Sequence, residues 1–567
     1  MPKKKERITI TSALPYANGV KHLGNITGSL LPADVFHRFM DLFEIPNIYI
    51  SGTDEHGTQI EIEALKEKMK PNEYVDKYHE IQKEIYNKWG MDFTFFGRTT
   101  SKTHYKFTQK MFLVMNKNGY VSKGDLTQPF CTTDSMWLAD RFINGNCPHC
   151  SYEHARGDQC ENCGKLLDPT ELKNPRCAIC GKSTIKFKSS KHLFLDLPKL
   201  QQELDHWISK QTNWPQNTIS IAKGWLKEGL KPRCITRNTQ WGIPVPLHGY
   251  KNLVFYVWFD APMGYISMTE DASKNTKSKK RVGNWKNWWT DSQIYHFIGK
   301  DNVPFHTIIW PAMLMAAAEG KAKKSDTKFS LPTYVAGYEY LNWQGSKFST
   351  SRNVGVFSDV ALDLFPADYW RYYLCSMLPE SKDSNFEWED FQNRINNELI
   401  ANYGNAFYRI TSFINQHFGK VPSKGDPGQP EEELVSVINE NAKKIEKLVM
   451  KVRLREALKE IMELSGCINR YFQVKEPWFA VRNPRSKKDA KTCLYYSVNA
   501  IAAVTTMLHP FIPFTSSMAL NSLGIKNSTW NTATNFPVKS GSKIRPMILF
   551  QRIEDAELEK AKKAVGA

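Results

Sequence analysis

The chain has 567 residues, of which 41% are hydrophobic, and its formal net charge is +18. This length allows for about three to five domains, and the composition excludes a disordered or fibrous chain. The positive charge favours a polyanionic partner, most often nucleic acid, with a basic enzyme acting alone as the plain alternative. The most apolar run, around 500–508, is too short for the about 20 residues that a bilayer requires, so we expect a soluble protein.

The first residues predict a strand, a loop and a helix. Residues 8–12 alternate β-branched with small polar side chains, which indicates a buried strand. A Pro and an Asn-Gly pair then predict a loop, and His22-Leu-Gly-Asn stands at the start of a helical run through 29–43. A helix N-terminus that carries His and Gly is suited to binding phosphate. The plain alternative is an ordinary turn with a surface His.

Three further strand ends carry polar residues. Residues 47–51 lead into Gly-Thr-Asp-Glu-His-Gly, residues 254–258 into Phe-Asp-Ala-Pro-Met-Gly-Tyr, and residues 295–299 into Lys-Asp-Asn-Val-Pro-Phe-His. Because ligands bind outside the carboxyl ends of parallel strands, four strands are expected to present chemistry at one edge of a Rossmann-like sheet. The alternative for Asp54 is that it only caps the following helix.

Cysteine usage points to metal in a reducing, cytoplasmic compartment. Six of the 11 Cys form three Cys-x-x-Cys pairs, and we expect no signal peptide before them. Cys147, Cys150, Cys160 and Cys163 have the spacing of a closed, structural zinc site. A second zinc site is expected at the residues that bracket the first one, which are Cys131, Asp134, Cys177 and Cys180. If that site is empty, the outer pair consists of reduced thiols in a loop.

Beyond Asp390 the pattern becomes helical, with apolar residues at helical spacing through 434–449 and 453–464.

These blocks together resemble a known family. Leu14-Pro-Tyr-Ala-Asn-Gly followed by His22-Leu-Gly-Asn resembles the signature of class I aminoacyl-tRNA synthetases in the form found in methionyl-tRNA synthetases. Lys347-Phe-Ser-Thr-Ser-Arg is similar to the lysine loop of the same family, and further blocks match in order over nearly the whole chain.

The resemblance implies an α/β fold: a split Rossmann-like catalytic domain with a zinc-knuckle connective insertion, a stem-contact region and a C-terminal α-helical anticodon-binding bundle. The implied boundaries are 1–118 and 226–324 for the two catalytic halves, 119–225 for the insertion, 325–390 for the stem-contact region and 391–567 for the bundle.

The implied activity is a two-step ligation. ATP, with Mg²⁺, activates L-methionine to methionyl-adenylate and releases pyrophosphate, and methionine then passes to the 3′ adenosine of methionine tRNA, elongator and initiator alike. One structural Zn²⁺, or two, a monomeric state and no membrane partner are also expected.

The resemblance assigns roles to residues of this sequence. The catalytic candidates are His22, Asn25, Arg237 and Lys347. The nucleotide candidates are His22, Gly24, Asn25, Gly299, Asp301, Lys347, Ser349 and Thr350. The methionine candidates are Leu14, Tyr16, Asp54, Trp258, Ala261, Pro262, Tyr265, Asn302 and His306. The anticodon candidates are Asn405, Arg409 and Trp478, an exposed-looking aromatic, with a helix-packing role as the alternative for Trp478.

Two residues depart from the family pattern. Asn25 stands where a His is frequent, and it still offers a hydrogen-bond donor. Thr350 replaces the second lysine of the loop, so activation is expected to be slower or to depend on Lys347 and Arg352. These departures keep a non-catalytic RNA-binding relative open as an alternative. A class I synthetase for an aliphatic amino acid and a zinc-knuckle scaffold are the others.

Overall fold

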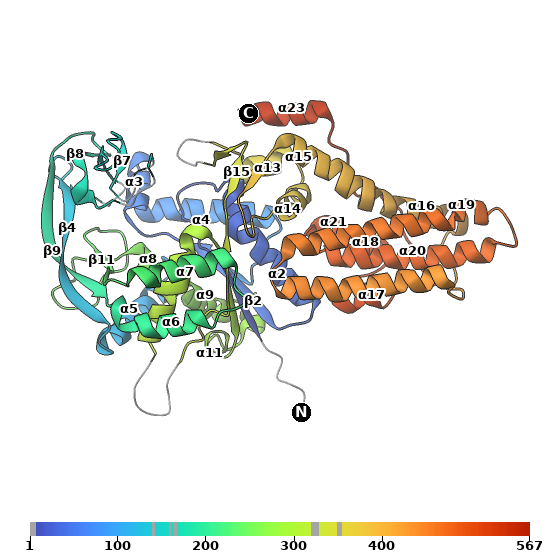
Figure 1. Ribbon diagram of the computed structural model, residues 1–567, viewed down its shortest axis with the longest axis horizontal. Helices are drawn as coiled ribbons and strands as arrows, with labels where there is room; N and C mark the ends of the chain where they lie inside the picture. The colour runs from blue at the N-terminus through green and yellow to red at the C-terminus, as the bar shows by residue number, and fades with distance from the viewer. Residues whose placement is uncertain are drawn as a thin grey trace.

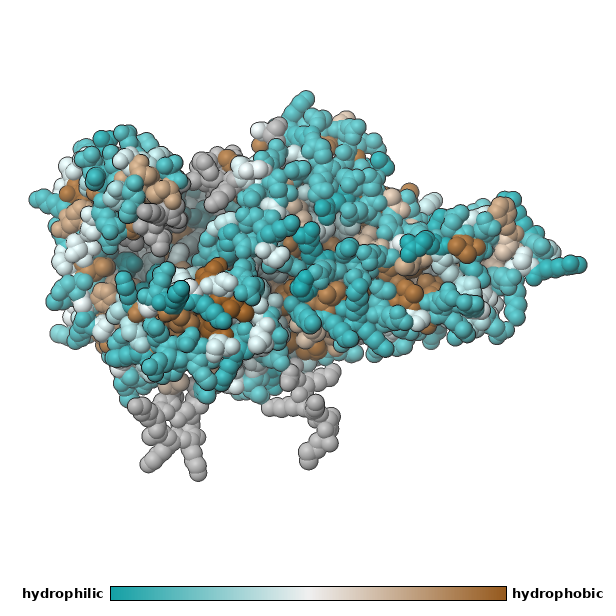
Figure 2. Space-filling model, in the orientation of Figure 1, coloured by the Kyte–Doolittle hydropathy of each residue, from teal (hydrophilic) through white to brown (hydrophobic). Residues whose placement is uncertain are grey.

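The computed structural model describes residues 7–138, 142–157, 160, 162–163, 167–318, 328–348 and 354–566. Figure 1 shows an α/β body with a small β-rich lobe at one end and a bundle of long helices extending from the other. The face shown in Figure 2 is mostly hydrophilic, and its apolar side chains lie in small separate groups. Within the described ranges, none of the helices has the length and apolar character needed to cross a membrane.

A five-stranded parallel sheet in the order β14-β13-β1-β2-β3 forms the centre of the body. Its strands are β1 (Ile8–Ser12), β2 (Asn47–Thr53), β3 (Phe95–Arg98), β13 (Gln293–Gly299) and β14 (Tyr334–Tyr338). Every residue of β1 is buried, as its sequence predicts. The register pairs Ile8 with Asn47 on one side and with Gln293 on the other, so the carboxyl ends of β1, β2 and β13 meet at one edge.

The two faces of the sheet belong to two hydrophobic cores. Ile8 and Ile10 share one core with α2, whereas Ile48 and Ile50 share the other with α5 and α9. The helices of this part are α1 (Leu23–Asn25), η1 (Ile26–Leu30, π-type), α2 (Leu31–Leu42), α3 (Thr58–Lys66), α4 (Pro71–Lys88), α5 (Lys102–Lys117), α8 (Val257–Asp260), α9 (Met263–Lys274), α10 (Lys279–Val282), α11 (Asn287–Thr290) and α12 (Trp310–Ala316). The first helix thus begins at Leu23, earlier than the predicted run. The Rossmann-like α/β class is confirmed.

One expectation about the sheet is wrong. The run that starts at Val254 does not add a strand to the central sheet, because β12 covers only Val254–Phe255 and pairs antiparallel with β11 (Thr236–Arg237). From Val257 the chain turns into α8, whose Val257 and Phe259 are buried. A short apolar run rich in aromatic and β-branched residues fits a buried helix as well as a strand, so the sequence pattern wrongly predicts a strand here.

In the sequence, the β-rich lobe is inserted between the strands of the first half of the sheet (β1 to β3) and those of the second half (β13 and β14). Its long hairpin pairs β4 (Val121–Cys131) with β9 (Ile185–Leu195) over their whole length, flanked by β5 (Met136–Trp137) and β10 (Arg233–Cys234). A smaller sheet contains β6 (Ile143–Asn146), β7 (Ala155–Arg156) and β8 (Lys173–Cys177). α6 (Gln201–Ser209) and α7 (Gln216–Glu228) lead back to the body.

The last third of the chain is helical, as predicted. It follows β15 (Leu341–Trp343), β16 (Ser346–Lys347), α13 (Ser358–Leu364), α14 (Ala367–Ser376), β17 (Ser384–Phe386) and α15 (Trp388–Asn393). The helices are η7 (Arg394–Gly404, π-type), α16 (Asn405–Phe418), α17 (Gln429–Met450), α18 (Leu454–Lys475), α19 (Pro477–Ala480), α20 (Lys487–Leu508), α21 (Pro513–Ser522), α22 (Trp530–Thr534) and α23 (Asp555–Ala564).

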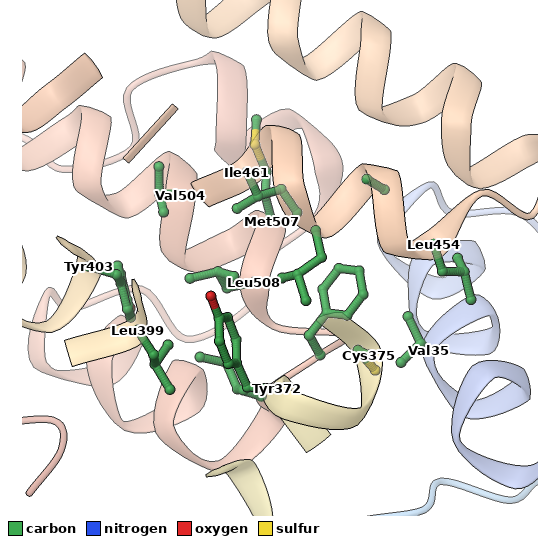
Figure 3. Close-up of a cluster of buried hydrophobic side chains, with 14 of the residues drawn as sticks. Val35, Tyr372, Cys375, Leu399, Tyr403, Leu454, Ile461, Val504, Met507 and Leu508 are labelled. Atoms are coloured by element: carbon green, nitrogen blue, oxygen red, sulfur yellow. The ribbon is translucent and has the colours of Figure 1, made fainter. Parts of the chain in front are cut away.

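The helical bundle and the α/β body share a core. Val35 of α2, Cys375 of α14, Leu454 of α18 and Leu508 of α20 are all fully buried and lie in the cluster drawn in Figure 3. Since these helices come from both parts of the molecule, the bundle is fixed to the body by apolar packing.

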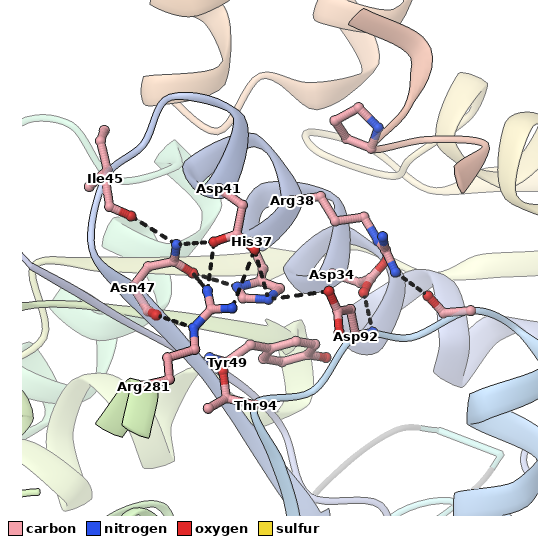
Figure 4. A network of polar contacts seen from close by, with 12 residues as sticks. Asp34, His37, Arg38, Asp41, Ile45, Asn47, Tyr49, Asp92, Thr94 and Arg281 are labelled. Atoms are coloured by element: carbon pink, nitrogen blue, oxygen red, sulfur yellow. Dashed lines mark hydrogen bonds and ion pairs between the residues drawn. The ribbon is translucent and has the colours of Figure 1, made fainter. Parts of the chain in front are cut away.

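A fully buried arginine adds polar contacts at this junction. Nη2 of Arg371 lies 2.6 Å from a carboxylate oxygen of Asp34 on α2. The same guanidinium donates to the carbonyls of Pro510 and Phe511, both at 2.9 Å, just beyond α20. Asp34 also accepts from Arg38, one turn further along α2, as Figure 4 shows.

Candidate functional site

The loops after β1, β2 and β13, together with α8, surround a cavity of about 650 Å³. All the methionine candidates lie on its wall: Leu14, Tyr16, Asp54, Trp258, Ala261, Pro262, Tyr265, Asn302 and His306. Five of the nucleotide candidates also line it: His22, Gly24, Asn25, Gly299 and Asp301. Residues from four distant parts of the chain therefore converge on one space.

Asp54 is a buried carboxylate at the centre of this wall. Its backbone is held by the first loop, because Asp54 N donates to Pro15 O at 2.9 Å and Ala17 N donates to Asp54 O at 2.8 Å. Its Oδ1 has no hydrogen-bond partner among the described residues. Burial, and then the nearby charge of Asp260, raise the pKa of Asp54 well above its ordinary value. The Oδ1 atom of this carboxylate is therefore an acceptor without a described partner, open to a cationic ligand. It does not cap α3, which begins after Gly57.

Aromatic side chains form the rest of the wall near Asp54. The indole of Trp258 donates to the hydroxyl of Tyr16 at 2.5 Å, and Phe305 meets the Trp258 ring edge-on with centroids 4.2 Å apart. Tyr265 Oη and His306 Nε2, which also line the cavity, are 2.9 Å apart. His306 Nδ1 lies 3.0 Å from a backbone carbonyl, so Nδ1 donates and Nε2 accepts from Tyr265. Burial lowers the pKa of His306 to about 4, which keeps this ring neutral.

His22 stands at the N-terminus of α1, on the other part of the wall. Its ring stacks on Phe348 with centroids 4.9 Å apart, and its Nδ1 is buried without a described partner. Burial, then the charge of Lys21, lower the pKa of His22 to about 4. A Cβ on Gly24 would lie only 3.0 Å from this ring, so a larger residue there would require the ring to shift. Asn25 is exposed beside it, and its Oδ1 accepts from the backbone of His22.

Of the four other catalytic or nucleotide candidates, only Arg237 has a described side chain, and it does not line the cavity. Its guanidinium stacks on Tyr256, 4.0 Å from the ring centroid, and Tyr256 does not line the cavity either. Lys347 ends β16, directly before Phe348. Ser349 and Thr350 lie outside the described residues, as does Arg352.

The sequence patterns missed a buried polar cluster behind the cavity. Asp260 Oδ2 lies 2.7 Å from His56 Nδ1 and 3.3 Å from His104 Nε2, and all three side chains are fully buried. These contacts tie the loop after β2 to α5 and to the start of the Ala261-Pro262 wall. The only sequence signal was the polarity of His56 and Asp260 at predicted strand ends.

Two clusters in the β-rich lobe could hold metal ions. The ligand atoms of Cys147, Cys150, Cys160 and Cys163 lie within 4.8 Å of one another, as do those of Cys131, Asp134, Cys177 and Cys180. In the first cluster, sulfur atoms are 3.6 Å (Cys150–Cys160) and 3.9 Å (Cys147–Cys163) apart. Zn–S bonds of about 2.3 Å in a tetrahedron place sulfurs about 3.8 Å apart, so the residues fit zinc. In the second, Cys131 and Cys180 are 3.7 Å apart, and Cys177 contacts Asp134 at 3.1 Å.

The anticodon candidates gather at the far part of the helical bundle. Asn405 and Arg409 are exposed one turn apart on α16. The guanidinium of Arg409 lies 4.9 Å from the Phe472 ring centroid, and Trp478 lies 6.0 Å from the same ring. Trp478 is half-buried rather than fully exposed, because it packs on Phe472. A separate groove of about 1320 Å³ lies between the body and the bundle. Its lining includes four carboxylates, Glu380, Glu398, Glu456 and Glu463, and a larger number of cations: Lys382, Arg394, Lys451, Arg453, Arg455, Lys459 and Arg470.

Two known protein families match the chain. The family described as tRNA synthetases class I (M) matches residues 8–411, so the sheet and its strand-end loops form a class I tRNA synthetase domain. The family described as the anticodon binding domain of methionyl tRNA ligase matches residues 421–567.

Relatives give the particular family. The methionine–tRNA ligase of Pyrococcus furiosus is 41% identical, over 97% of this chain and 76% of its own length. Methionine–tRNA ligase 1 of Acaryochloris marina is 41% identical, over 99% of this chain and 100% of its own length. A cytoplasmic relative from Dictyostelium discoideum is 42% identical, over 99% of this chain and 75% of its own length.

The chain belongs to the methionine–tRNA ligase family, and its activity is the ATP-dependent joining of methionine to tRNA. The crystal structure of the Mycobacterium tuberculosis methionyl-tRNA synthetase bound by methionyl-adenylate has the same fold, with a TM-score of 0.78, 20% identity and coverage of 97% of this chain and 100% of the other. These matches favour this family over the alternatives of an aliphatic-substrate synthetase and a zinc scaffold.

Proposed function

We propose that the cavity is the synthetic site, in which methionine and ATP react to give methionyl-adenylate before the amino acid passes to tRNA. The observation that carries this proposal is the buried Asp54 carboxylate, whose Oδ1 has no partner among the described residues, in an aromatic pocket beside a helix N-terminus with His22. The carboxylate suits the ammonium of methionine, and aromatic edges suit its thioether. The helix N-terminus and His22 suit the phosphates of ATP, which arrive with Mg²⁺.

In this proposal each part of the wall has one task. Tyr16, Trp258, Tyr265 and His306 shape the pocket for the methionine side chain, while Asp54 fixes the amino end. His22, Gly24, Asn25, Gly299 and Asp301 hold the nucleotide, and Lys347, with its loop through Ser349 and Thr350, covers the pyrophosphate. Arg237, whose guanidinium stacks on Tyr256, is proposed as a further catalytic residue. The step needs no protein nucleophile, because the protein only positions the reactants and stabilises negative charge.

ATP–pyrophosphate exchange, measured with each standard amino acid in turn, tests this assignment. The expected result is rapid exchange with methionine and exchange near background with leucine, isoleucine and valine. Exchange that is faster with an aliphatic amino acid, or absent with methionine while tRNA still binds, would contradict it.

We expect zinc in the β-rich lobe to be structural, because both clusters are closed by protein ligands. Metal analysis of purified protein should give between one and two zinc ions per chain. Cys160→Ser should remove one equivalent and lower the unfolding temperature. Cys375→Ser is the matched control, since Cys375 is equally buried but lies far from either cluster. A zinc content near zero would refute the expectation.

The half-buried Trp478 is proposed to stack a base of the CAU anticodon, with Asn405 and Arg409 at base edges. Base stacking on an aromatic is worth about 1–3 kcal/mol, so Trp478→Ala should lower kcat/KM for tRNA about 5-fold to 150-fold. The exposed neighbour Phe479→Ala is the control. The loss should vanish when the wild type and Trp478→Ala are compared on tRNA with an altered anticodon; an equal loss on both tRNAs would indicate helix packing instead.

The path of the tRNA, the cellular location and the oligomeric state are further parts of the proposal. The basic groove between body and bundle offers a path for the tRNA backbone, elongator or initiator, towards the cavity. We also propose a cytoplasmic location, as in the Dictyostelium relative, and a monomeric state. Gel filtration checks the latter.

A further inference from the structure

Lys21 places an ammonium group on the cavity wall that the reaction described so far does not use. The side chain is only 6% exposed and lines the cavity. Its Nζ donates to Asn18 Oδ1 at 2.6 Å. Among the described residues, no carboxylate lies within ion-pair distance of Nζ. An ammonium has three donors, so hydrogen-bonding capacity remains.

A buried cation without a counter-ion is costly, and such groups are retained where a ligand supplies the missing charge. Burial lowers the pKa of Lys21 to about 7, and the charge of Asp54 only partly opposes this shift. An anion that enters the cavity would therefore be attracted to Lys21 and would favour its protonated form.

The position of Lys21 relates it to both substrates. Its carbonyl accepts from Ser358 N at 2.8 Å, which fixes the backbone immediately before His22. Its charge acts on His22, whose pKa it lowers, and is itself influenced by Asp54. The ammonium thus lies within electrostatic range of the proposed phosphate donor and of the proposed acceptor for the methionine ammonium. In the proposed synthetic site, the carboxylate of methionine would meet the α-phosphate between these two groups.

We propose that Lys21 is a further catalytic residue for methionine activation, and that its ammonium contacts the oxygen atoms at which the methionine carboxylate and the α-phosphate react. This rests on the proposed synthetic site. In the step, a carboxylate oxygen forms a bond to the α-phosphorus. The bond from that phosphorus to the oxygen bridging to the β-phosphate breaks, and pyrophosphate leaves with the electron pair. Two anionic groups approach each other, so a fixed cation between them stabilises the transition state.

Methionine-dependent ATP–pyrophosphate exchange by Lys21→Gln tests the proposal, because glutamine fills most of the space without the charge. Removing one preorganised donor from a transition state costs about 10²-fold in kcat, which is the expected fall. Lys21→Arg should recover at least a tenth of the wild-type kcat. Lys106→Gln, at an exposed lysine on α5, is the matched control.

A second measurement separates chemistry from folding. Lys21→Ala leaves a space that small amines can enter, so added ethylamine should raise its exchange rate in proportion to amine concentration, whatever its unfolding temperature. A kcat for Lys21→Gln within threefold of wild type would overturn the proposal. So would a loss that neither arginine nor added amine restores, since that indicates a structural role. Absence of exchange by the wild type would instead refute the synthetic site itself.

Discussion

Asp54→Asn is expected to abolish most methionine activation while leaving the fold intact. Asparagine has the same shape, but it cannot neutralise the ammonium of methionine inside a buried pocket. Losing one partner of a buried ion pair costs about 3–5 kcal/mol, which is about a 200-fold to 4,000-fold fall in kcat/KM for methionine. The unfolding temperature should be unchanged or raised, because the free protein no longer buries a carboxyl group whose Oδ1 has no described partner.

The pH dependence provides a second measure of the same group. Since burial and Asp260 raise the pKa of Asp54, part of the carboxyl is protonated in the free protein at low pH. Wild-type kcat/KM for methionine should therefore rise with pH until Asp54 is ionised, and Asp54→Asn should lack this rise. Glu84→Gln, at an exposed carboxylate on α4, is the control and should behave as wild type. A tenfold or smaller loss in Asp54→Asn would contradict the assignment.

Arg371→Met is expected to produce the largest loss of stability. The substitution leaves Asp34 as a buried carboxylate with one remaining cationic partner, Arg38, and frees the carbonyls of Pro510 and Phe511. The free energy of unfolding should fall by about 3–5 kcal/mol. Denaturation by urea, followed by circular dichroism, measures this change. The control is Lys459→Met, which breaks an exposed pair with Glu463 and should cost about 1 kcal/mol or less.

Acid pH should lower the free energy of unfolding of the wild type through the same ion pair. Burial alone would raise the pKa of Asp34, but Arg38 and Arg371 outweigh burial and lower it. The contribution of the pair is therefore present above the ordinary carboxyl pKa of about 3.9 and is lost as the pH falls below it. Wild type and Arg371→Met should accordingly converge in stability in acid. If the two differ by less than 1 kcal/mol at neutral pH, the buried network does not hold the junction.

The central strand and the helical bundle could be predicted because each has one dominant period. Residues 8–12 alternate as a strand, and Leu434, Ile438, Ile445 and Val449 recur at helical spacing and are all buried. The run from Val254 has no such period, so its sequence does not distinguish a strand from a buried helix. In the structure it continues into α8, in which Val257 and Phe259 are buried. Similarly, the burial of Trp478 depends on Phe472, which comes from another helix.

The candidate site was predictable where strand ends carry polar residues and where the family resemblance applies. Lys21 was missed, because a lysine in a loop is normally solvated, and only the fold shows that this one is enclosed. The His56–Asp260–His104 cluster was missed for a related reason. His56 and His104 are 204 and 156 residues from Asp260 along the chain, so no spacing in the sequence relates them.

A crystal structure of the protein bound to methionyl-adenylate tests the central claim most directly. The account predicts the methionine ammonium on Asp54, the thioether among Tyr16, Trp258 and His306, and the phosphate beside His22 and Lys21. Adenylate bound outside this cavity, or bound inside it with its ammonium turned away from Asp54, would contradict the account.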